Sequence, residues 1–326
     1  MENRSDRESS PPSAGAAQTG GWIAFHYHTL LGIFFFLLIL WIFWGLWPQW
    51  LTDIIGRKKV FVTAVLNGIT LGGLYFIVAS GFTLVFGLMR NVNLAHGSLY
   101  LLGAYIGYEA ATASGWWYMG ILAGAFSMAV AGAALQFFVF RHMAGQELRQ
   151  TLVTIGISIV LADLMLAIWT GTTYQFELPE WFFGATTLPI ISSVRANGEL
   201  VFIKYPIFRL VVLQTAIIIG VLLWLFLNRT RTGIIVRAGV DDRNMLSACG
   251  VNIHAVFVMV SAIGAGLAGF AGVIGSTALS IAPGEDVRYL LASLVVVIVG
   301  GMGSVAGAAV GALIIGIAEQ VGLVYF

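Results

Sequence analysis

Two polar segments interrupt long apolar runs and could present side chains and backbone groups to a polar ligand. The first, MRNVNLAHGS, covers residues 89–98, and the second, VGGMGS, covers residues 299–304. Within a membrane, broken backbone persists only where it lines a cavity or is buried in protein, and paired interruptions indicate a transport pathway. The alternative is that both segments are cytoplasmic turns with capping residues. The candidate pathway residues are Asn91, Asn93, His96, Gly97, Ser98, Gly300, Gly301, Gly303 and Ser304.

A third polar segment, NRTRTGIIVRAGVDDRNMLSACGVN at residues 228–252, carries four arginines between two apolar runs. It contains the start signals of a helix of about two turns. Asp241 is placed to cap the N-terminus, where its carboxylate also meets the positive end of the helix dipole. Val240 and Met245 occupy the two positions of a hydrophobic staple.

The end of the same short helix is also specified. Gly250 stands where a left-handed C-terminal cap favours glycine, and Val251 is placed to contact Leu246. A short rigid helix on a basic face can be moved by another protein. The alternative interpretation is a solvated loop that its arginines keep in the cytoplasm.

The sequence lacks the motifs of common catalytic and metal sites. It has no GxxxxGK[ST] phosphate loop and no HExxH, GxSxG or CxxC motif, and Cys249 is its only cysteine. An intramembrane enzyme that used His96 and Ser98 would have no acidic partner nearby in the sequence. We therefore expect a protein that is not an enzyme, with no catalytic residue, no metal and no cofactor. If it pumps, another polypeptide hydrolyses the ATP.

Composition indicates the elements that must position these segments. Of the 326 residues, 59% are hydrophobic and 10% are charged, and the mean hydropathy is +0.92. The fold class is therefore an all-α, polytopic helical membrane protein with about eight or nine membrane segments, some broken or re-entrant. The formal net charge of +1 gives no reason to expect nucleic-acid binding. The expected spans are 30–47, 61–88, 94–113, 117–140, 151–171, 206–227, 253–279, 287–299 and 304–325.

The arrangement of polar residues predicts orientation and domains. Residues 1–29 form a disordered tail, residues 30–58 an extra anchor helix with a linker, and residues 59–326 the membrane domain. Basic residues place the loops near Arg90, near residues 141–149 and at 228–252 on one side, the cytoplasm. The opposite side receives the longest loop, residues 172–205. Under strict alternation residues 57–59, which are basic, would lie outside.

Small residues recur every four positions along two spans, as Gly264, Ala268, Gly272 and Ser276 and as Gly303, Gly307 and Gly311. This spacing lets helix backbones approach closely. Each polar interruption is also followed by a small-residue helix, which suggests an internal repeat. Asp163 and Glu319 are isolated ionisable groups inside spans and have no evident partner in the sequence.

Three blocks together resemble the LivH-type permease subunit of branched-chain amino acid ABC transporters. They are NGITLGGLYFIVASGFTLVFGLMRNVNLAHGSLYLLGAY, RAGVDDRNMLSACGVN and SLVVVIVGGMGSVAGAAVGALIIG, in the order of the family. The resemblance covers about residues 60–326. It implies a permease in the bacterial inner membrane that works with a second, LivM-like permease, two cytoplasmic ATPase subunits and a periplasmic substrate-binding protein.

The resemblance also implies roles for the polar segments. Residues 241–250 become the element seated in a groove of the ATPase, and NLAHGS becomes a broken central helix beside the translocation path. The family departs from this chain in two ways, since it usually lacks residues 1–58 and continues through one more hydrophobic helix after Phe326. The coupling candidates are Arg237, Asp241, Asp242, Arg243, Met245, Leu246 and Gly250.

Two classes of substrate and two classes of mechanism remain open. The substrate is a branched-chain or other hydrophobic amino acid, or alternatively urea, a short amide or an aromatic acid, because the family spans all of these. The mechanism is import driven by ATP hydrolysis in partner subunits, or alternatively a stand-alone channel or secondary transporter. The short capped helix favours the first mechanism, because a channel has no need of it.

Overall fold

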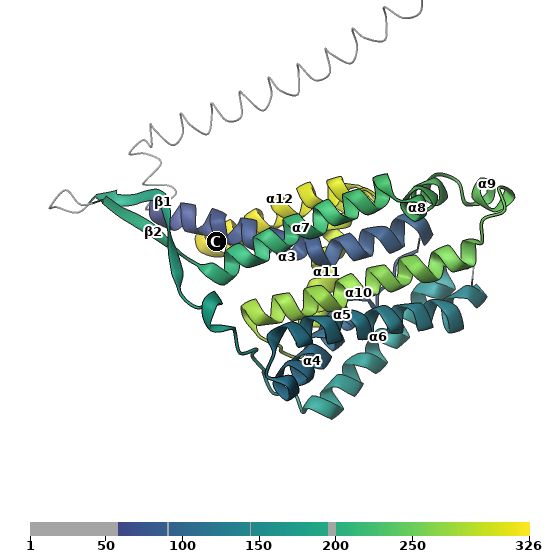
Figure 1. Ribbon diagram of the computed structural model, residues 1–326, viewed down its shortest axis with the longest axis horizontal. Coiled ribbons are helices and arrows are strands. Elements are labelled where there is room, and N and C mark those ends of the chain that lie inside the picture. Colours follow the sequence, from purple (N-terminus) through teal and green to yellow (C-terminus); the bar gives the residue numbers. More distant parts are fainter. Residues whose placement is uncertain (1–57, 90, 144, 195–199) are drawn as a thin grey trace, which may run out of the picture. The chain divides into compact units, whose positions relative to one another are not determined.

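The computed structural model describes residues 58–89, 91–143, 145–194 and 200–326 (Figure 1). The tail and anchor helix expected within residues 1–57, and Arg90, lie outside these described residues. Lys58–Phe326 forms one compact unit. Its elements in chain order are α3 (Lys58–Met89), α4 (His96–Ser114), α5 (Trp117–Ala134), η1 (Leu135–Val139), η2 (Phe140–Met143), α6 (Glu147–Trp169), η3 (Glu180–Phe182), β1 (Ala185–Val194), β2 (Leu200–Pro206), α7 (Ile207–Arg229), α8 (Arg231–Asp241), α9 (Arg243–Ala248), α10 (Ile253–Leu279), α11 (Glu285–Gly300) and α12 (Val305–Tyr325).

The helical prediction is confirmed for the described part of the chain, where every expected span coincides with a helix. Six of these helices are long and apolar enough to cross a membrane: α3, α5 with its extension to Met143, α6, α7, α10 and α12. The two others differ in length and polarity. α11 has only 16 residues, fewer than the roughly 20 needed to span a bilayer. α4 has 19 residues and includes Glu109 and several small residues.

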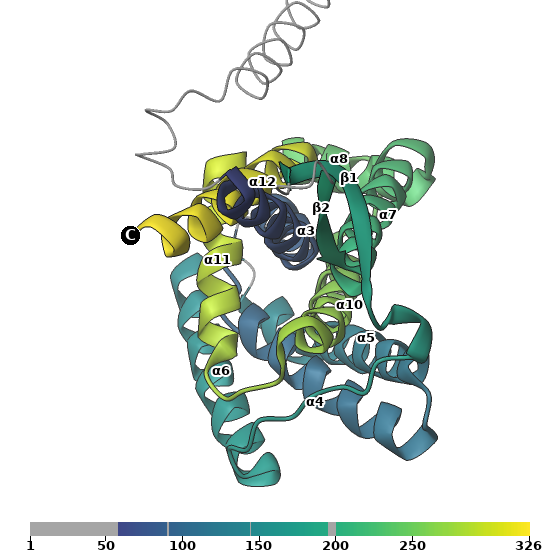
Figure 2. The same ribbon diagram turned by 90° about the vertical axis from the view of Figure 1, so that its left-hand side faces the viewer.

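Among the six helices long enough to span a membrane, α3 and α10 are the most buried, and Figure 2 shows other helices beside both of them. Glycine allows this packing. A Cβ on Gly72 of α3 would lie 2.8 Å from the carbonyl oxygen of Ala312, and Gly272 of α10 faces the carbonyl oxygen of Tyr100 in α4. Lipid gives membrane helices no hydrophobic driving force to associate. Close packing of their backbones stabilises the contact instead. The prediction that small-residue faces pack helices together is confirmed.

The long loop after α6, at residues 172–205, contains a β-hairpin that the sequence analysis did not predict. β1 and β2 pair antiparallel from Ala185 opposite Pro206 to Val194 opposite Leu200. The hairpin is attached to α3, because the Tyr205 hydroxyl lies 2.7 Å from Thr70 Oγ1 and donates to the Leu66 carbonyl oxygen at 2.9 Å. β-branched residues favour these strands.

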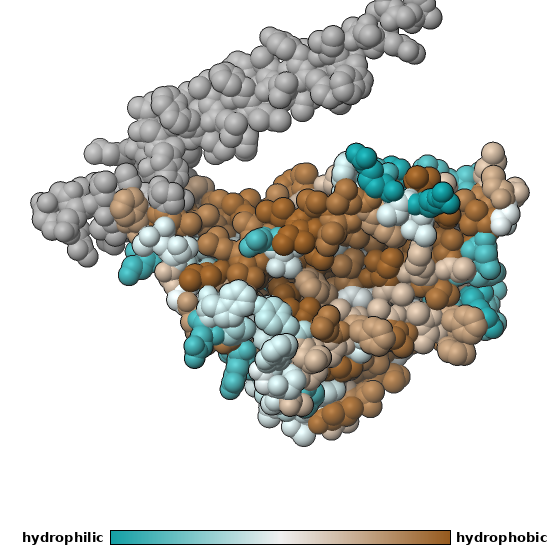
Figure 3. All heavy atoms as spheres, in the orientation of Figure 1, coloured by the Kyte–Doolittle hydropathy of each residue, from teal (hydrophilic) through white to brown (hydrophobic). Residues whose placement is uncertain are grey.

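The hairpin and the short helix α9 lie at opposite ends of the unit, the hairpin end and the α9 end (Figure 1). Met89, Asn91, Arg141 and His254 line one cavity at the α9 end, so the loops that carry the basic residues share a face, as predicted. Lys59 lies at the other end of α3 from Met89, as strict alternation requires. Figure 3 shows hydrophobic residues over the middle of the unit and most hydrophilic residues toward its ends.

Candidate functional site

The first predicted polar segment lies along α6 in a parallel arrangement. Thr151 Oγ1 donates to Asn91 Oδ1 at 2.9 Å, and Thr154 Oγ1 accepts from the Leu94 amide at 3.1 Å. Both pairs are separated by 60 positions in the sequence. Thr154 is fully buried. The amide of Leu94, which the broken helix would leave unpaired, is therefore satisfied by a side chain of α6.

The same offset continues along the whole of α4. Ser98 Oγ lies 2.7 Å from Ser158 Oγ, and Trp169 Nε1 donates to Glu109 Oε1 at 2.9 Å, again with 60 positions between the partners. Segments that keep a constant offset in the same direction run parallel and in register. The hydroxyls on one face of α6 thus hold residues 91–98 in place before α4 carries on toward the hairpin end.

The contacts of His96 show that the first turn of α4 is buried inside the helix bundle. Its Nε2 lies 3.1 Å from the Val78 carbonyl oxygen, its ring makes an edge contact with Phe82, and its side chain is 1% exposed. Val78 precedes Met89 by about 16 Å along α3 at a rise of 1.5 Å per residue. The first turn of α4 therefore lies well inside the bundle, which argues against a simple surface turn for this segment.

The first turn of α11 meets the first turn of α4. Ser98 Oγ donates to Asp286 Oδ2 at 3.3 Å, and Gly97 packs against the carbonyl oxygen of Asp286. Asp286 is 5% exposed. From this meeting point α4 runs toward the hairpin end, whereas α11 crosses the bundle and ends at Gly300 against α12 (Figure 2). Two short helices thus begin at the same level and continue in different directions.

The break before α11 lies between the predicted spans 253–279 and 287–299, but its contact with the start of α4 was not predicted. Ser280 has φ +122° and Gly284 has φ +89°, and the two lie on either side of Pro283. Pro-Gly followed by two acidic residues, Glu285 and Asp286, is a helix-start pattern.

The second predicted cluster forms the turn between α11 and α12. Gly301 and Gly303 have φ +92° and +85°, and Ser304 Oγ accepts from the Gly307 amide at 3.0 Å, which caps α12. The nearest neighbours of Gly303 are Gly87 of α3 and Val240 of α8. Residues 299–304 therefore contact α3 and α8, whereas residues 96–98 contact Asp286 of α11.

Asn91 also borders a small polar cavity at the α9 end, of about 50 Å³. Asn91 Nδ2 and Gln136 Oε1 are both buried, and neither has a hydrogen-bond partner among the described residues. One is a donor and the other an acceptor, and both residues line the cavity. The arrangement suits a small polar group or water between them.

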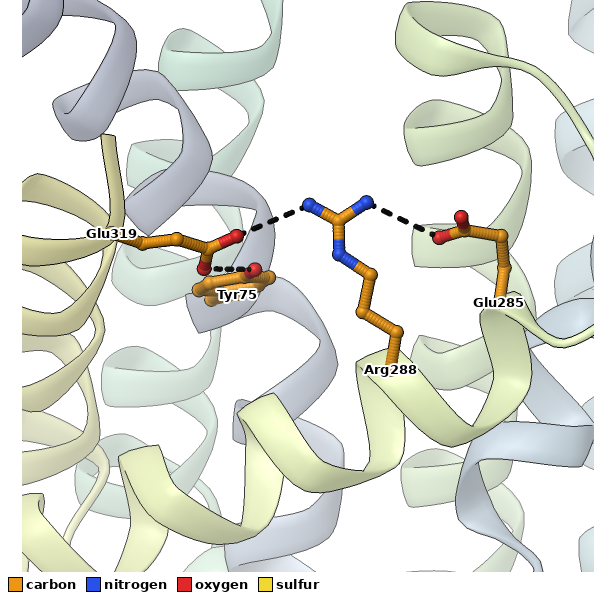
Figure 4. A network of polar contacts seen from close by, with 4 residues as sticks. All are labelled: Tyr75, Glu285, Arg288 and Glu319. Carbon is orange, nitrogen blue, oxygen red and sulfur yellow. Dashed lines mark hydrogen bonds and ion pairs between the residues drawn. The ribbon is translucent and has the colours of Figure 1, made fainter. Parts of the chain in front are cut away.

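A charged network links α3, α11 and α12 (Figure 4). Tyr75 donates to Glu319 Oε2 at 2.6 Å, and Arg288 lies between Glu319 Oε1, at 3.2 Å, and Glu285 Oε2, at 3.5 Å. Glu319, which has no evident partner in the sequence, therefore has two in the structure. Asp163 differs, because it is exposed on α6 and the described part of the chain offers it no polar partner.

The short basic-segment helix is α9, and its N-cap is Asp242 rather than Asp241. Asp242 Oδ1 accepts from the Met245 amide at 3.1 Å, whereas Asp241 is the last residue of α8. The prediction was one residue early because α8 extends through the first of two adjacent acids that both suit a cap. The staple assigned to Val240 and Met245 fails for the same reason, since those positions shift by one.

The predicted end of α9 is confirmed. Gly250 has φ +81°, its amide donates to the Ser247 carbonyl at 3.0 Å, and the Val251 amide donates to the Leu246 carbonyl at 3.4 Å. This is a Schellman motif. Leu246 points inward against Gly239, whereas Met245 is 66% exposed. Arg237 donates to Asn228 Oδ1 at 2.7 Å, and the side chain of Arg243 lies outside the described residues.

Known transport proteins resemble this chain over most of its length. The model of the family described as branched-chain amino acid transport system / permease component matches residues 64–326. The chain is 29% identical over 278 residues to the high-affinity branched-chain amino acid transport system permease protein BraD of Pseudomonas aeruginosa, over 80% of this chain and 86% of that protein.

Two further relatives have related descriptions. The high-affinity branched-chain amino acid transport system permease protein LivH of Escherichia coli K12 is 28% identical over 276 residues, or 81% of this chain and 87% of that protein. A probable branched-chain amino acid transport permease protein LivH of Methanocaldococcus jannaschii is 23% identical over 271 residues, or 82% of this chain and 81% of that protein. No solved structure matches the chain.

Proposed function

Because the chain belongs to the permease-component family of branched-chain amino acid transport systems, we propose that it is a membrane-spanning subunit of an ATP-driven importer of branched-chain or other hydrophobic amino acids. It is a multi-pass membrane protein with several helices long enough to span a bilayer. The bacterial inner membrane is the proposed location, because three loops with basic residues share one face and the relatives are bacterial and archaeal permeases.

The observation that carries this function is the meeting of α4 and α11 inside the bundle. Ser98 and Asp286 join two helix starts at a level where an uninterrupted helix would have no free polar groups. Interrupted helices that face each other in this way supply backbone and side-chain contacts along a transport pathway. The proposed pathway therefore follows Asn91, His96 and Ser98 on one side and α11 on the other.

The partners proposed for this subunit follow from what the chain lacks and what α9 exposes. The sequence has no phosphate loop, so two ATPase subunits supply the energy. α9 is held rigid by its caps and turns Met245 outward, as an element that docks in a groove of an ATPase requires. A second permease and a substrate-binding protein complete the proposed assembly.

The turn at residues 299–304 links these two parts in the proposal. Gly303 packs against Gly87 and faces Val240 of α8, so a movement of α8 and α9 reaches the end of α11 directly. We assign Gly300, Gly301, Gly303 and Ser304 to this connection. A displacement at the α9 end would then shift α11 and alter its contact with Ser98.

Transport by the complete assembly tests the function. The chain, its partner permease, the ATPases and the binding protein are placed in liposomes, and uptake of labelled leucine, urea, acetamide and benzoate is measured with and without ATP. Uptake of leucine that requires ATP supports the proposal. Preference for urea, an amide or an aromatic acid would replace the substrate, and uptake by this chain alone without ATPase would replace the mechanism with that of a channel.

A further inference from the structure

Arg288, Glu285 and Glu319 form a charged group where a membrane protein normally avoids charge. Tyr75, which bonds to Glu319, lies about 12 Å along α3 from Asn67, the partner of Arg209 at the hairpin end. It also lies about 21 Å from Met89 at the other end of α3. The group is therefore level with the middle of α3 and within the thickness of the bilayer, where ionisable side chains usually have a function.

One side of this group is fixed and the other is open. Both oxygens of Glu319 are engaged, one by the buried Tyr75 hydroxyl at 2.6 Å and one by Arg288 at 3.2 Å. The contact between Arg288 and Glu285 is longer, at 3.5 Å, and is made within one turn of α11. The side chain of Arg288 is 44% exposed and that of Glu285 is 30% exposed. A ligand can therefore reach the pair.

An apolar stripe continues from this group along the exposed face of α11. Leu291, Val295 and Ile298 follow Arg288 at intervals of three or four residues and are 54%, 45% and 60% exposed. Residues at these intervals share one face of a helix. The face thus offers an ion pair near the N-terminal end of α11 and an aliphatic surface beyond it, toward Gly300.

The chemistry of this face matches a zwitterion with an aliphatic side chain. A guanidinium has five N–H donors in a planar fork that suits a carboxylate, and the two ion pairs leave several of them unused. Glu285 supplies an acceptor for an ammonium group. With two carboxylates and one guanidinium the group carries a formal charge of −1, so a neutral zwitterion can bind without changing the total.

We propose that Arg288 and Glu285 form an intramembrane contact site for the α-carboxylate and α-ammonium groups of an amino acid, with its aliphatic side chain against Leu291 and Val295. Glu319, held by Tyr75, positions Arg288 and does not touch the ligand. The ligand replaces the Arg288–Glu285 pair with one pair to each residue. This inference rests on the proposed import function and identifies the part of the substrate that this subunit recognises.

The test uses the complete assembly with Glu285→Gln, and with Glu180→Gln as the matched control, an exposed carboxyl outside the network. We expect Glu285→Gln to lower leucine uptake about tenfold at a limiting leucine concentration, because an ammonium loses its charged partner. Basal ATP hydrolysis stays within about twofold of the unmodified assembly, and Glu180→Gln transports normally.

A purely structural network predicts a different pattern. In that case Tyr75→Phe, which removes the 2.6 Å bond to Glu319, would reduce uptake as much as Glu285→Gln. The proposal expects Tyr75→Phe to have less than half the effect of Glu285→Gln, and expects a rise in the KM for leucine in Glu285→Gln with little change in maximal rate. Equal effects, or normal uptake in Glu285→Gln, would overturn it.

The two proposals fail in different ways. If the unmodified assembly shows no uptake of leucine that depends on ATP, the import function itself is wrong and the contact site falls with it. If the unmodified assembly transports leucine and Glu285→Gln transports it with the same KM, only the contact site is wrong.

Discussion

Ser98 and Asp286 are 188 positions apart in the sequence, yet the Ser98 hydroxyl donates to the Asp286 carboxylate at 3.3 Å. The contact joins the first turns of α4 and α11, the two short helices that the proposed pathway follows. It is buried on both sides, since Ser98 is 1% and Asp286 5% exposed. The stability of this contact therefore depends on how closely the two helix starts approach.

Gly97 controls that approach, so Gly97→Ala should separate the two helices. A Cβ at this position would clash with the carbonyl oxygen of Asp286 and lie 2.8 Å from Leu290 Cβ. Overpacking of this kind costs about 1–3 kcal/mol. We expect a lower midpoint of thermal unfolding and loss of most leucine uptake in the reconstituted assembly.

The control for Gly97→Ala is Gly156→Ala in α6, where an added Cβ would meet no atom within 4 Å. This variant should unfold and transport like the unmodified protein, or be slightly more stable, because alanine favours a helix more than glycine does. Equal behaviour of the two variants would show that the close contact of α4 with α11 does not limit stability or transport.

A second prediction concerns the cap of α9. Asp242→Ala removes the acceptor of the Met245 amide and should destabilise the helix by about 1 kcal/mol. Hydrogen exchange of the amides in α9 should then accelerate about fivefold. Asp242→Asn, which keeps an acceptor at the cap, should exchange more slowly than Asp242→Ala.

The neighbouring acid provides the matched control for this prediction. Asp241 is the last residue of α8 and does not cap α9, so Asp241→Ala should leave exchange in α9 close to that of the unmodified protein. If Asp241→Ala accelerates exchange as much as Asp242→Ala, the assignment of the cap is wrong.

Met245 gives a separate test of docking, because it is exposed and its loss should not disturb the fold. Met245→Glu places a charge on the outward side of α9, and a charge buried without a partner in an interface is costly. We expect substrate-stimulated ATP hydrolysis to fall several-fold while unfolding is unchanged. Ser247→Glu, at another exposed position of α9, maps which side docks, and normal stimulation in both variants would contradict a docking role for α9.

The positions of the helices could be predicted because their signal is local. Long apolar runs indicate spans by length and composition alone, and the glycine spacing in α10 and α12 correctly indicates close helix packing. The role of Gly250 as the C-terminal cap of α9 could also be predicted, because a left-handed cap favours a residue without a Cβ. In each case the deciding interaction lies within a few residues of the pattern.

The parts that were missed depend on residues distant in the sequence. Asp286 gains its place only through Ser98, and Glu319 gains partners only when α3, α11 and α12 assemble. The hairpin was missed because its alternation is weak and its attachment through Tyr205 to Thr70 spans 135 positions. The choice between Asp241 and Asp242 depended on where α8 ends, a boundary that adjacent acids leave undetermined.

The last prediction concerns Thr154, which is fully buried and whose Oγ1 accepts a hydrogen bond from the Leu94 amide at 3.1 Å. Thr154→Val has nearly the same shape but no acceptor, so it leaves a buried amide unpaired at a cost of about 1–3 kcal/mol. Thr154→Ser keeps the oxygen and loses one methyl group, and it should be less destabilising. If the hydroxyls of α6 hold the start of α4 in place, thermal unfolding and leucine uptake should both rank unmodified first, Thr154→Ser second and Thr154→Val last. The reverse order of the two variants would show that packing by the methyl group, and not the hydrogen bond, holds residues 91–98 against α6.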